Sequence, residues 1–129
     1  MKRILIVDDN EVFCSLIACL LVKLGYQVKT AGTAAEAKAV MRETSVDLVL
    51  LDHILPDLDG LDLLAILRID YPDLPIIMMT GQDLDEGLMQ SLVAGRALAY
   101  ISKVAVYSRL LPSVEQALSV RQTAPCAYA

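Results

Sequence analysis

The chain has 129 residues, 56% of them hydrophobic and 21% charged, and its formal net charge at pH 7 is −5. This length fits one domain, and the acidic balance argues against direct nucleic-acid binding, because nothing neutralises a phosphate backbone. No apolar run approaches the roughly 20 residues that cross a bilayer, and the apolar stretch after Met1 runs straight into acids, which argues against membrane insertion or a signal peptide.

Apolar runs alternate with helical patterns along the chain. In order, they predict a strand at residues 4–7, a helix at 11–24, a strand at 27–30, a helix at 34–43, a strand at 47–51, a helix at 61–70, a strand at 75–79, a helix at 86–94, a strand at 98–102 and a helix at 109–121. Residues 1–121 are predicted to form one domain, and the tail at 122–129 is predicted to fray.

This alternation favours one fold class. Strands separated by helices of this length pair in parallel through right-handed crossovers. The sequence therefore predicts an α/β fold, a doubly wound five-stranded parallel sheet in the flavodoxin-like order 2-1-3-4-5, flanked by five helices. The three most apolar strands are expected to be central, and the two more polar strands are expected to be edges.

Polar residues stand at the carboxyl ends of four predicted strands, namely Asp8 with Asp9, Asp52, Thr80 and Lys103. Because ligands of a doubly wound sheet bind at that edge, we expect these side chains to converge. Carboxylate oxygens suit Mg²⁺, which often completes its shell with substrate phosphate. Asp52 is a candidate nucleophile for an aspartyl-phosphate, Lys103 a neutralising cation, and Thr80 a hydroxyl donor to a phosphate oxygen.

Each of these residues also has a plainer interpretation. Asp8 and Asp9 could only cap the first helix, because aspartate favours that position. Asp52 could be a polar strand terminus, and Thr80 and Lys103 could be ordinary loop and surface residues. Their coincidence at four strand ends favours a phosphoryl-transfer site over these separate interpretations.

The remaining titratable residues add no second site. The three cysteines, Cys14, Cys19 and Cys126, lack metal-type spacing and predict reduced thiols in a cytoplasmic protein. His53 follows Asp52, but successive residues of a strand point to opposite faces, so no chemical role is predicted for this histidine.

Six motifs occur in the order that response-regulator receiver domains show, and together they resemble that family from Met1 to about Arg121. The motifs are MKRILIVDD at 1–9, LGYQV at 24–28, AEA at 35–37, LLDHILPDLDG at 50–60, PIIMMTG at 75–81 and YISK at 100–103. The family-like start favours Met1 as the true amino terminus.

The resemblance implies roles for individual residues. Asp8 and Asp9 would hold Mg²⁺, with help from Asp52 and the backbone carbonyl of Ile54. Asp52 would take a phosphoryl group from a histidine kinase or a histidine phosphotransfer protein. The protein would not be an enzyme in the ordinary sense, because its only reactions would be phosphorylation and slow dephosphorylation of its own Asp52. The bulky Ile54 near the expected water path predicts the slow hydrolysis.

The resemblance also implies a switch. Lys103 would pair with the phosphate, Thr80 would turn inward onto it, and Tyr100 would follow by changing rotamer. The switched surface would lie on the fourth helix, fifth strand and fifth helix, and would bind a downstream protein or a second copy of the chain.

Three features depart from the family pattern. Val104 follows Lys103 where the family usually has proline, so the peptide bond between them is predicted to be trans. The segment GRALAY at 95–100 is one residue longer than usual. The first helix is apolar on both sides, and we expect a sheet-facing side and an outer side that docks a helix of a kinase or of a second copy of the chain. The residues expected on the sheet side are Phe13, Leu16, Ile17, Leu20 and Leu24, and those on the outer side are Cys14, Ala18, Cys19 and Val22.

Other functions stay open. The missing proline is compatible with a receiver that serves mainly as a binding module with weak or no phosphorylation. A small-molecule phosphatase with an aspartate nucleophile would need a second acid two residues later, where Ile54 stands. A flavin or nucleotide carrier would need a glycine-rich phosphate loop, which this sequence lacks.

Overall fold

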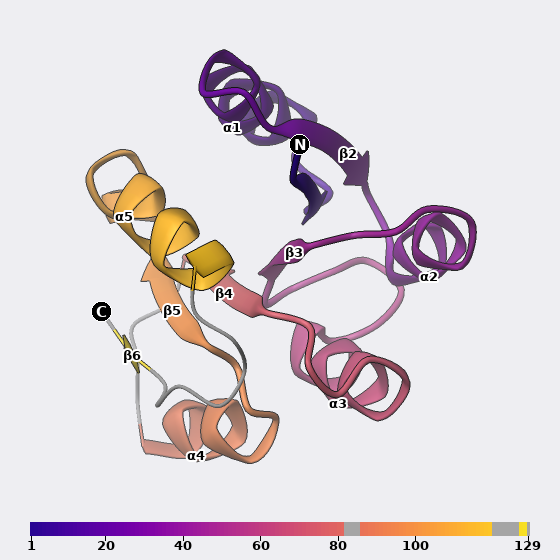
Figure 1. The fold of residues 1–129 in the computed structure, drawn as a ribbon. Helices are drawn as coiled ribbons and strands as arrows, with labels where there is room; N and C mark the ends of the chain where they lie inside the picture. Colours follow the sequence, from indigo (N-terminus) through magenta and orange to yellow (C-terminus); the bar gives the residue numbers. More distant parts are fainter. Residues whose placement is uncertain (82–85, 120–126, 129) are drawn as a thin grey trace.

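The computed structural model describes residues 1–81, 86–119 and 127–128, and strands and helices alternate through them (Figure 1). The elements are β1 (Arg3–Val7), α1 (Glu11–Lys23), β2 (Gln27–Ala31), α2 (Ala34–Glu43), β3 (Leu48–Asp52), α3 (Gly60–Asp70), β4 (Ile76–Thr80), α4 (Glu86–Ala94), β5 (Ala99–Ser102), the 3₁₀ turn η1 (Lys103–Ala105), α5 (Val106–Ser119) and β6 (Ala127–Tyr128).

The strands form one parallel sheet in the order β2-β1-β3-β4-β5-β6. The predicted order of the first five strands is confirmed, and the apolar strands β1, β3 and β4 lie inside. The sequence did not predict β6, which pairs with β5 through Ala99 with Ala127 and Tyr100 with Tyr128. β5 is therefore not the edge strand that the sequence predicted, whereas β2 is an edge. β6 falls in the stretch predicted to fray. Residues 122–126 and 129 lie outside the described residues, so the domain boundary and the fraying stay predictions.

Helices cover both faces of the sheet, with α1 and α5 on one face and α2, α3 and α4 on the other (Figure 1). The strands supply side chains to both layers in alternation, because successive residues of a strand point to opposite faces. In β1, Ile4 and Ile6 pack in the α1–α5 layer, whereas Leu5 and Val7 pack in the other. β3 and β4 are buried along their whole length. This two-layer core fixes the strand ends that carry the polar residues.

The predicted sheet side of α1 is correct for Ile17 but wrong for Leu16 and Leu24. The side chains buried against the sheet are Cys14, Ile17 and Leu21. Leu16 and Leu24, expected on the sheet side, are 51% and 50% exposed. Because α1 is apolar almost all round, its periodicity does not decide which side faces the sheet.

The outer side of α1 is correspondingly different from the prediction. Of the residues expected there, Cys14 is buried and Ala18 is half-buried, while Cys19 and Val22 are exposed. Val12 and Leu16 join them, since positions three and four apart share one side of a helix. We call these four exposed residues, Val12, Leu16, Cys19 and Val22, the α1 stripe. Among the described residues, no helix has both the length and the apolar character that a membrane crossing requires.

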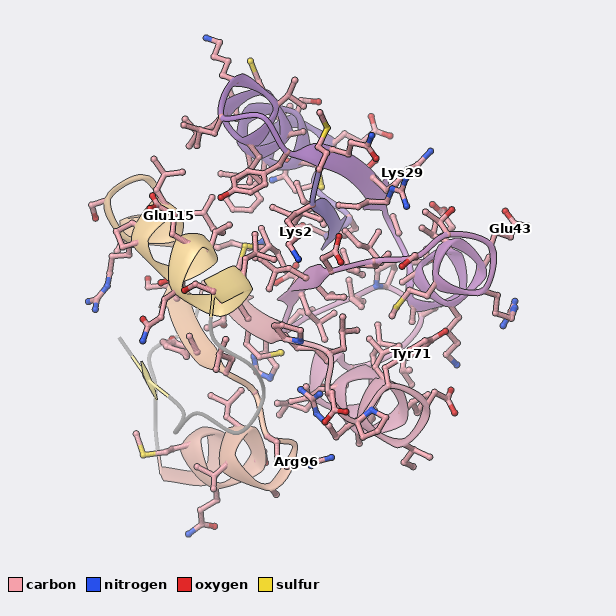
Figure 2. The ribbon with its side chains drawn as sticks, in the orientation of Figure 1. Lys2, Lys29, Glu43, Tyr71, Arg96 and Glu115 are labelled. Carbon is pink, nitrogen blue, oxygen red and sulfur yellow. The ribbon has the colours of Figure 1, made fainter. Side chains whose placement is uncertain are left out.

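The side chain of Arg68, in α3, joins the segment that follows α3 to the segment that follows α4. This arginine is 6% exposed. Its guanidinium donates to five main-chain oxygens, those of Tyr71, Pro72, Leu74, Gly95 and Arg96. Arg96, in the turn after α4, has a positive φ of 56° and lies between α3 and α4 (Figure 2). The segment at 95–100, which is one residue longer than usual in the family it resembles, therefore turns at Arg96, and Arg68 fixes this turn to the end of α3.

Candidate functional site

The carboxyl ends of the strands bring together the predicted site residues. Asp8 follows β1, Asp52 ends β3, Thr80 ends β4, and Lys103 follows β5. Asp8, Asp52 and Thr80 are buried, with 2%, 5% and 1% of their surfaces exposed. Polar side chains are buried at such depth only when neighbouring groups compensate them, so their mutual contacts decide what the site can do.

Three carboxylates and one ammonium group form the centre of the site. Asp8, Asp9 and Asp52 each offer an oxygen, and these oxygens lie within 4.8 Å of one another. Lys103 Nζ lies 2.6 Å from Asp8 Oδ2 and 3.2 Å from Asp52 Oδ2. Asp8 Oδ2 is fully buried, and the ammonium group of Lys103 is the charged partner that compensates it. One ammonium group leaves two negative charges uncompensated, and hard oxygen ligands with this charge fit a divalent cation such as Mg²⁺.

The close approach of these charges shifts the pKa values of Asp52 and Lys103. Burial, followed by the neighbouring charge of Asp8, raises the pKa of Asp52 above its usual range, although Lys103 acts in the opposite direction. Burial alone would lower the pKa of Lys103, but its pairing with Asp8 and Asp52 raises it instead. Lys103 is therefore an ammonium at neutral pH, while the Asp52 carboxylate is destabilised where no metal is bound.

Local sequence positions Asp8. Its backbone amide donates to Ala31 O at 2.9 Å, and its Oδ1 accepts from the Asn10 amide at 2.9 Å. Asn10 is the N-cap of α1 and accepts from the Phe13 amide at 3.0 Å. The interpretation in which Asp8 and Asp9 only cap this helix is therefore wrong. Asn10 was not among the predicted site residues, although an asparagine before a helical pattern is a recognised start signal of a helix.

Cys14 completes this side of the site. Its thiol donates to Asp8 O at 3.2 Å. Burial and the nearby charge of Asp8 raise the pKa of Cys14 to about 11. The protonated, buried thiol supports the Asp8 backbone and is not a reactive nucleophile.

Lys103 lies in the turn η1, and its ammonium group also stands over the ring of Phe13, 4.8 Å from the ring centre. Phe13 packs against the sheet core as predicted, and its cation–π contact with Lys103 was not predicted from the sequence. No peptide bond in the described part of the chain is cis, which confirms the trans bond predicted between Lys103 and Val104.

Thr80 lies at the end of β4 and Tyr100 lies in β5, where the predicted switch residues were expected. Thr80 Oγ1 lies 3.5 Å from His53 Nδ1, and His53 Nε2 lies 4.0 Å from Asp59 Oδ1. His53 lies just beyond β3, so the strand alternation on which its prediction rested does not apply. Tyr100 is 3% exposed and packs in the α2–α4 layer of the core. Their movement on phosphorylation stays a prediction.

The loop between β3 and α3 carries Ile54, whose backbone carbonyl was expected at the metal. Ile54 pairs with Asp59 in a short antiparallel bridge, and the Gly60 amide donates to His53 O at 2.7 Å. A Cβ on Gly60 would overlap the backbone oxygen of Asp52, so only glycine fits at this start of α3. The base of the loop is thus closed beside Asp52, and the Ile54 side chain is 57% exposed.

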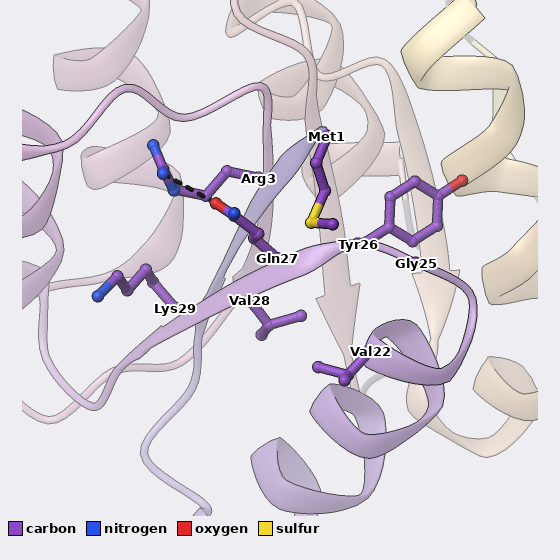
Figure 3. Close-up of a pocket in the computed structure, with 8 residues that line it drawn as sticks. All are labelled: Met1, Arg3, Val22, Gly25, Tyr26, Gln27, Val28 and Lys29. Carbon is purple, nitrogen blue, oxygen red and sulfur yellow. Dashed lines mark hydrogen bonds between the residues drawn. The ribbon is translucent and has the colours of Figure 1, made fainter.

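Two clefts differ in their relation to this site. One, of about 580 Å³, is lined by residues that include Asp8, Asp9, Thr33 and Pro56. Figure 3 shows the second, of about 520 Å³, at the edge strand β2. Asp8 and Asp9 line the first cleft, whereas none of the three clustered acids lines the second.

Comparison with known proteins adds sequence relatives to this geometry. The family described as "Response regulator receiver domain" matches residues 4–115. The probable transcriptional regulatory protein TcrX of Mycobacterium tuberculosis is 38% identical over 92 residues, which are 71% of this chain and 39% of TcrX. The transcriptional regulatory protein ZraR of Salmonella typhimurium is 36% identical over 116 residues, 90% of this chain and 26% of ZraR. The chain therefore spans between a quarter and two fifths of the length of these curated relatives.

Solved structures show the same fold. A CheY-like response regulator receiver domain protein from Methanospirillum hungatei superposes with a TM-score of 0.87 and 33% identity, covering 92% of this chain and 94% of that one. The response regulator TrrA of Thermotoga maritima, solved in complex with Mg(2+)-BeF, has a TM-score of 0.82 and 31% identity, covering 92% of this chain and all of that one.

Proposed function

This chain belongs to the response regulator receiver domain family, and from that membership we propose that it receives a phosphoryl group on Asp52. The observation that carries the proposal is the contact of Asp52 with Lys103, at 3.2 Å, beside the buried Asp8. A carboxylate held next to a fixed cation, at the strand ends of a doubly wound sheet, is what phosphoryl transfer to a side chain requires.

Mg²⁺ is part of the proposal. Asp8, Asp9 and Asp52 would hold the ion together with the backbone carbonyl of Ile54, and the two uncompensated negative charges of the acid cluster support this assignment. The complex of TrrA with Mg(2+)-BeF supports it in a relative of the same fold. When bound, the ion would neutralise charge on the phosphoryl oxygens during transfer.

The transfer itself uses few protein groups. An Asp52 carboxylate oxygen attacks the phosphorus of a donor phosphohistidine, the new O–P bond forms as the N–P bond breaks, and the imidazole leaves. Lys103 stays charged and pairs with the phosphoryl group, because its neighbours raise its pKa. Thr80 would then donate its hydroxyl to a phosphoryl oxygen, and Tyr100 would change rotamer in response.

The aspartyl-phosphate is proposed to be long-lived. Ile54 is a large apolar side chain, 57% exposed beside the acceptor, and would hinder the approach of water. The chain would act on no separate substrate, so the phosphoryl group serves as a signal. A lifetime of only seconds for the purified phosphoprotein would contradict the role given to Ile54.

The phosphoryl donor is proposed to be a histidine kinase or a histidine phosphotransfer protein in the cytoplasm, and the α1 stripe its docking surface. A donor histidine must approach Asp52 at the carboxyl ends of the strands, where α1 begins directly after Asp9 and Asn10. Val12 is 70% exposed at this end, and Val22 is 56% exposed one helix length away. An apolar stripe that starts at the reactive centre suits a helix of the donor.

Intact-mass measurement tests the central claim. The native chain and Asp52→Asn are incubated with acetyl phosphate, each with Mg²⁺ and with a chelator. We expect one phosphoryl group on the native chain with Mg²⁺ and none in the other three samples. Uptake by Asp52→Asn would place the phosphate elsewhere. Absence of uptake by the native chain would favour a receiver that serves only as a binding module.

A further inference from the structure

Asp57, at the tip of the loop between β3 and α3, binds the amino terminus of α2. Its Oδ1 accepts from the Ala34 amide at 2.9 Å, and its Oδ2 accepts from the Ala35 amide at 3.1 Å. Both distances are those of good hydrogen bonds to a carboxylate. The two segments are far apart in the sequence, so this contact is a tertiary tether and not a local turn.

The tether completes the capping of α2. A helix begins with backbone amides that have no partner inside the helix. Thr33, the N-cap, accepts from the Glu36 amide at 3.1 Å, which leaves the amides of Ala34 and Ala35 for Asp57. These two backbone hydrogen bonds lower the pKa of Asp57, with the amide of Ala34 as the largest cause. Asp57 is therefore a carboxylate at neutral pH, and its negative charge also suits the positive end of the helix dipole.

The same tether fixes the loop that holds the proposed metal ligands. At its base, the loop is closed by the hydrogen bond from Gly60 to His53 and by the bridge between Ile54 and Asp59. At its tip, Asp57 is bound to α2. Ile54 belongs to the base, and the short stretch of chain from Ile54 to Asp57 connects its carbonyl to the fixed tip.

The cleft beside the acids places the tether near the metal site. Pro56, the neighbour of Asp57, and Thr33, the N-cap of α2, line the same 580 Å³ cleft as Asp8 and Asp9. The loop and the start of α2 therefore both line this cleft. A loose tip would let the loop, with the Ile54 carbonyl, shift relative to the carboxylates.

We infer that Asp57 is a positioning residue for Mg²⁺ at the phosphorylation site, acting by tying the metal-binding loop to α2. The inference rests on the proposed function for the identity of the metal ligands. Asp57 does not touch the metal or the phosphoryl group. Its removal should weaken Mg²⁺ binding about tenfold, at the lower end of the range for residues that orient metal ligands.

A matched pair of variants separates positioning from helix stability. Asp57→Ala removes both hydrogen bonds of the tether. Thr33→Ala removes a cap from the same end of α2 but leaves the loop attached. Asp57→Asn, which keeps the shape of the side chain but cannot accept from both amides, serves as the second variant should Asp57→Ala fold poorly. Far-UV circular dichroism checks that each protein is folded.

Two readouts are measured for the native chain and each variant. Calorimetric titration with MgCl₂ gives the affinity for the ion without any phosphorylation. The rate of phosphorylation by acetyl phosphate, followed by intact mass at several Mg²⁺ concentrations, gives the half-saturating concentration and the rate at saturation. We expect both Asp57 variants to raise the half-saturating concentration, by about tenfold for Asp57→Ala, with the saturated rate unchanged.

Thr33→Ala should bind Mg²⁺ like the native chain. Equal losses of Mg²⁺ affinity for Thr33→Ala and Asp57→Ala would show that Asp57 acts only as a cap of α2. An unchanged Mg²⁺ affinity for Asp57→Ala would show that Asp57 does not position the metal ligands. If the native chain binds Mg²⁺ but takes no phosphoryl group, the proposed function fails, whereas the calorimetric comparison still decides the role of Asp57.

Discussion

Lys103 offers a quantitative test of how the acid cluster is stabilised. Lys103→Met keeps most of the side-chain volume but removes the ammonium group that contacts Asp8 and Asp52. Removing one partner of a buried ion pair costs about 3–5 kcal/mol, because the other charge stays buried. The Lys103 side chain is 25% exposed, so water screens part of this effect. We therefore expect a loss of about 2–3 kcal/mol in the free energy of unfolding without metal.

Mg²⁺ should narrow the difference in the free energy of unfolding between the native chain and Lys103→Met. An ion that binds only the folded protein stabilises it by RT ln(1 + [L]/Kd), which is about 1.4 kcal/mol at ten times Kd. Lys103→Met lacks the ammonium group that repels the ion, so it should bind Mg²⁺ more tightly and gain more stability than the native chain. The added cation thus takes over part of the compensation that Lys103 provides.

Urea unfolding followed by circular dichroism, with a chelator and with MgCl₂, measures both effects. Lys29→Met, which removes an exposed lysine on β2, is the control and should change stability little. A loss for Lys103→Met below about 0.5 kcal/mol without metal, the size of an ordinary surface substitution, would show that the carboxylates do not depend on this ion pair. A difference that Mg²⁺ leaves unchanged or widens would contradict metal binding at these carboxylates.

Three further predictions concern other parts of the molecule. Arg68→Met should lower the free energy of unfolding by about 3 kcal/mol in urea titrations, because five main-chain oxygens lose a charged donor; a change near zero would contradict this role. Because the pKa of Asp57 is lowered in the folded protein, its carboxylate stabilises the fold fully at pH values above its unfolded pKa of about 3.9. This stabilisation is lost as the pH falls through the lower pKa of the folded state. The melting temperature of Asp57→Asn should therefore lie below that of the native chain by a constant amount from about pH 5 to 8, and this difference should close below about pH 4. The lower melting temperature of Thr33→Ala should persist at acidic pH, because no titrating group is removed. Val22→Glu in the α1 stripe should slow phosphotransfer from a histidine kinase but leave phosphorylation by acetyl phosphate unchanged, and equal effects on both donors would remove the docking role.

The strand ends could be predicted from the sequence for a simple reason. Strands β1 and β3 read as continuous apolar runs, and each is closed by an aspartate, Asp8 or Asp52. In a parallel sheet such ends meet at one edge whatever the details of packing. The convergence of Asp8, Asp52 and Lys103 therefore depends on topology alone, which the alternation of strands and helices already indicates.

Other features depend on contacts that local patterns do not encode. Nearly every position of α1 is apolar, so the choice of Cys14 and Ile17 for the buried side is made by the sheet. Arg68 has the sequence context of a helix surface, yet main-chain oxygens surround it. Asp57 caps a helix that precedes it by more than twenty residues. In each case the deciding partner is distant in the chain.

The ion pair between Lys103 and Asp8 has a consequence for the kinetics of folding. It joins the end of the first strand to the turn after the fifth, so it can form only when nearly the whole sheet is in place. Interactions that form this late are largely absent from the folding transition state, and changes to them act mainly on the unfolding rate. Mg²⁺ bound beside this pair should therefore prolong the lifetime of the folded receiver while leaving the speed of its folding almost unchanged.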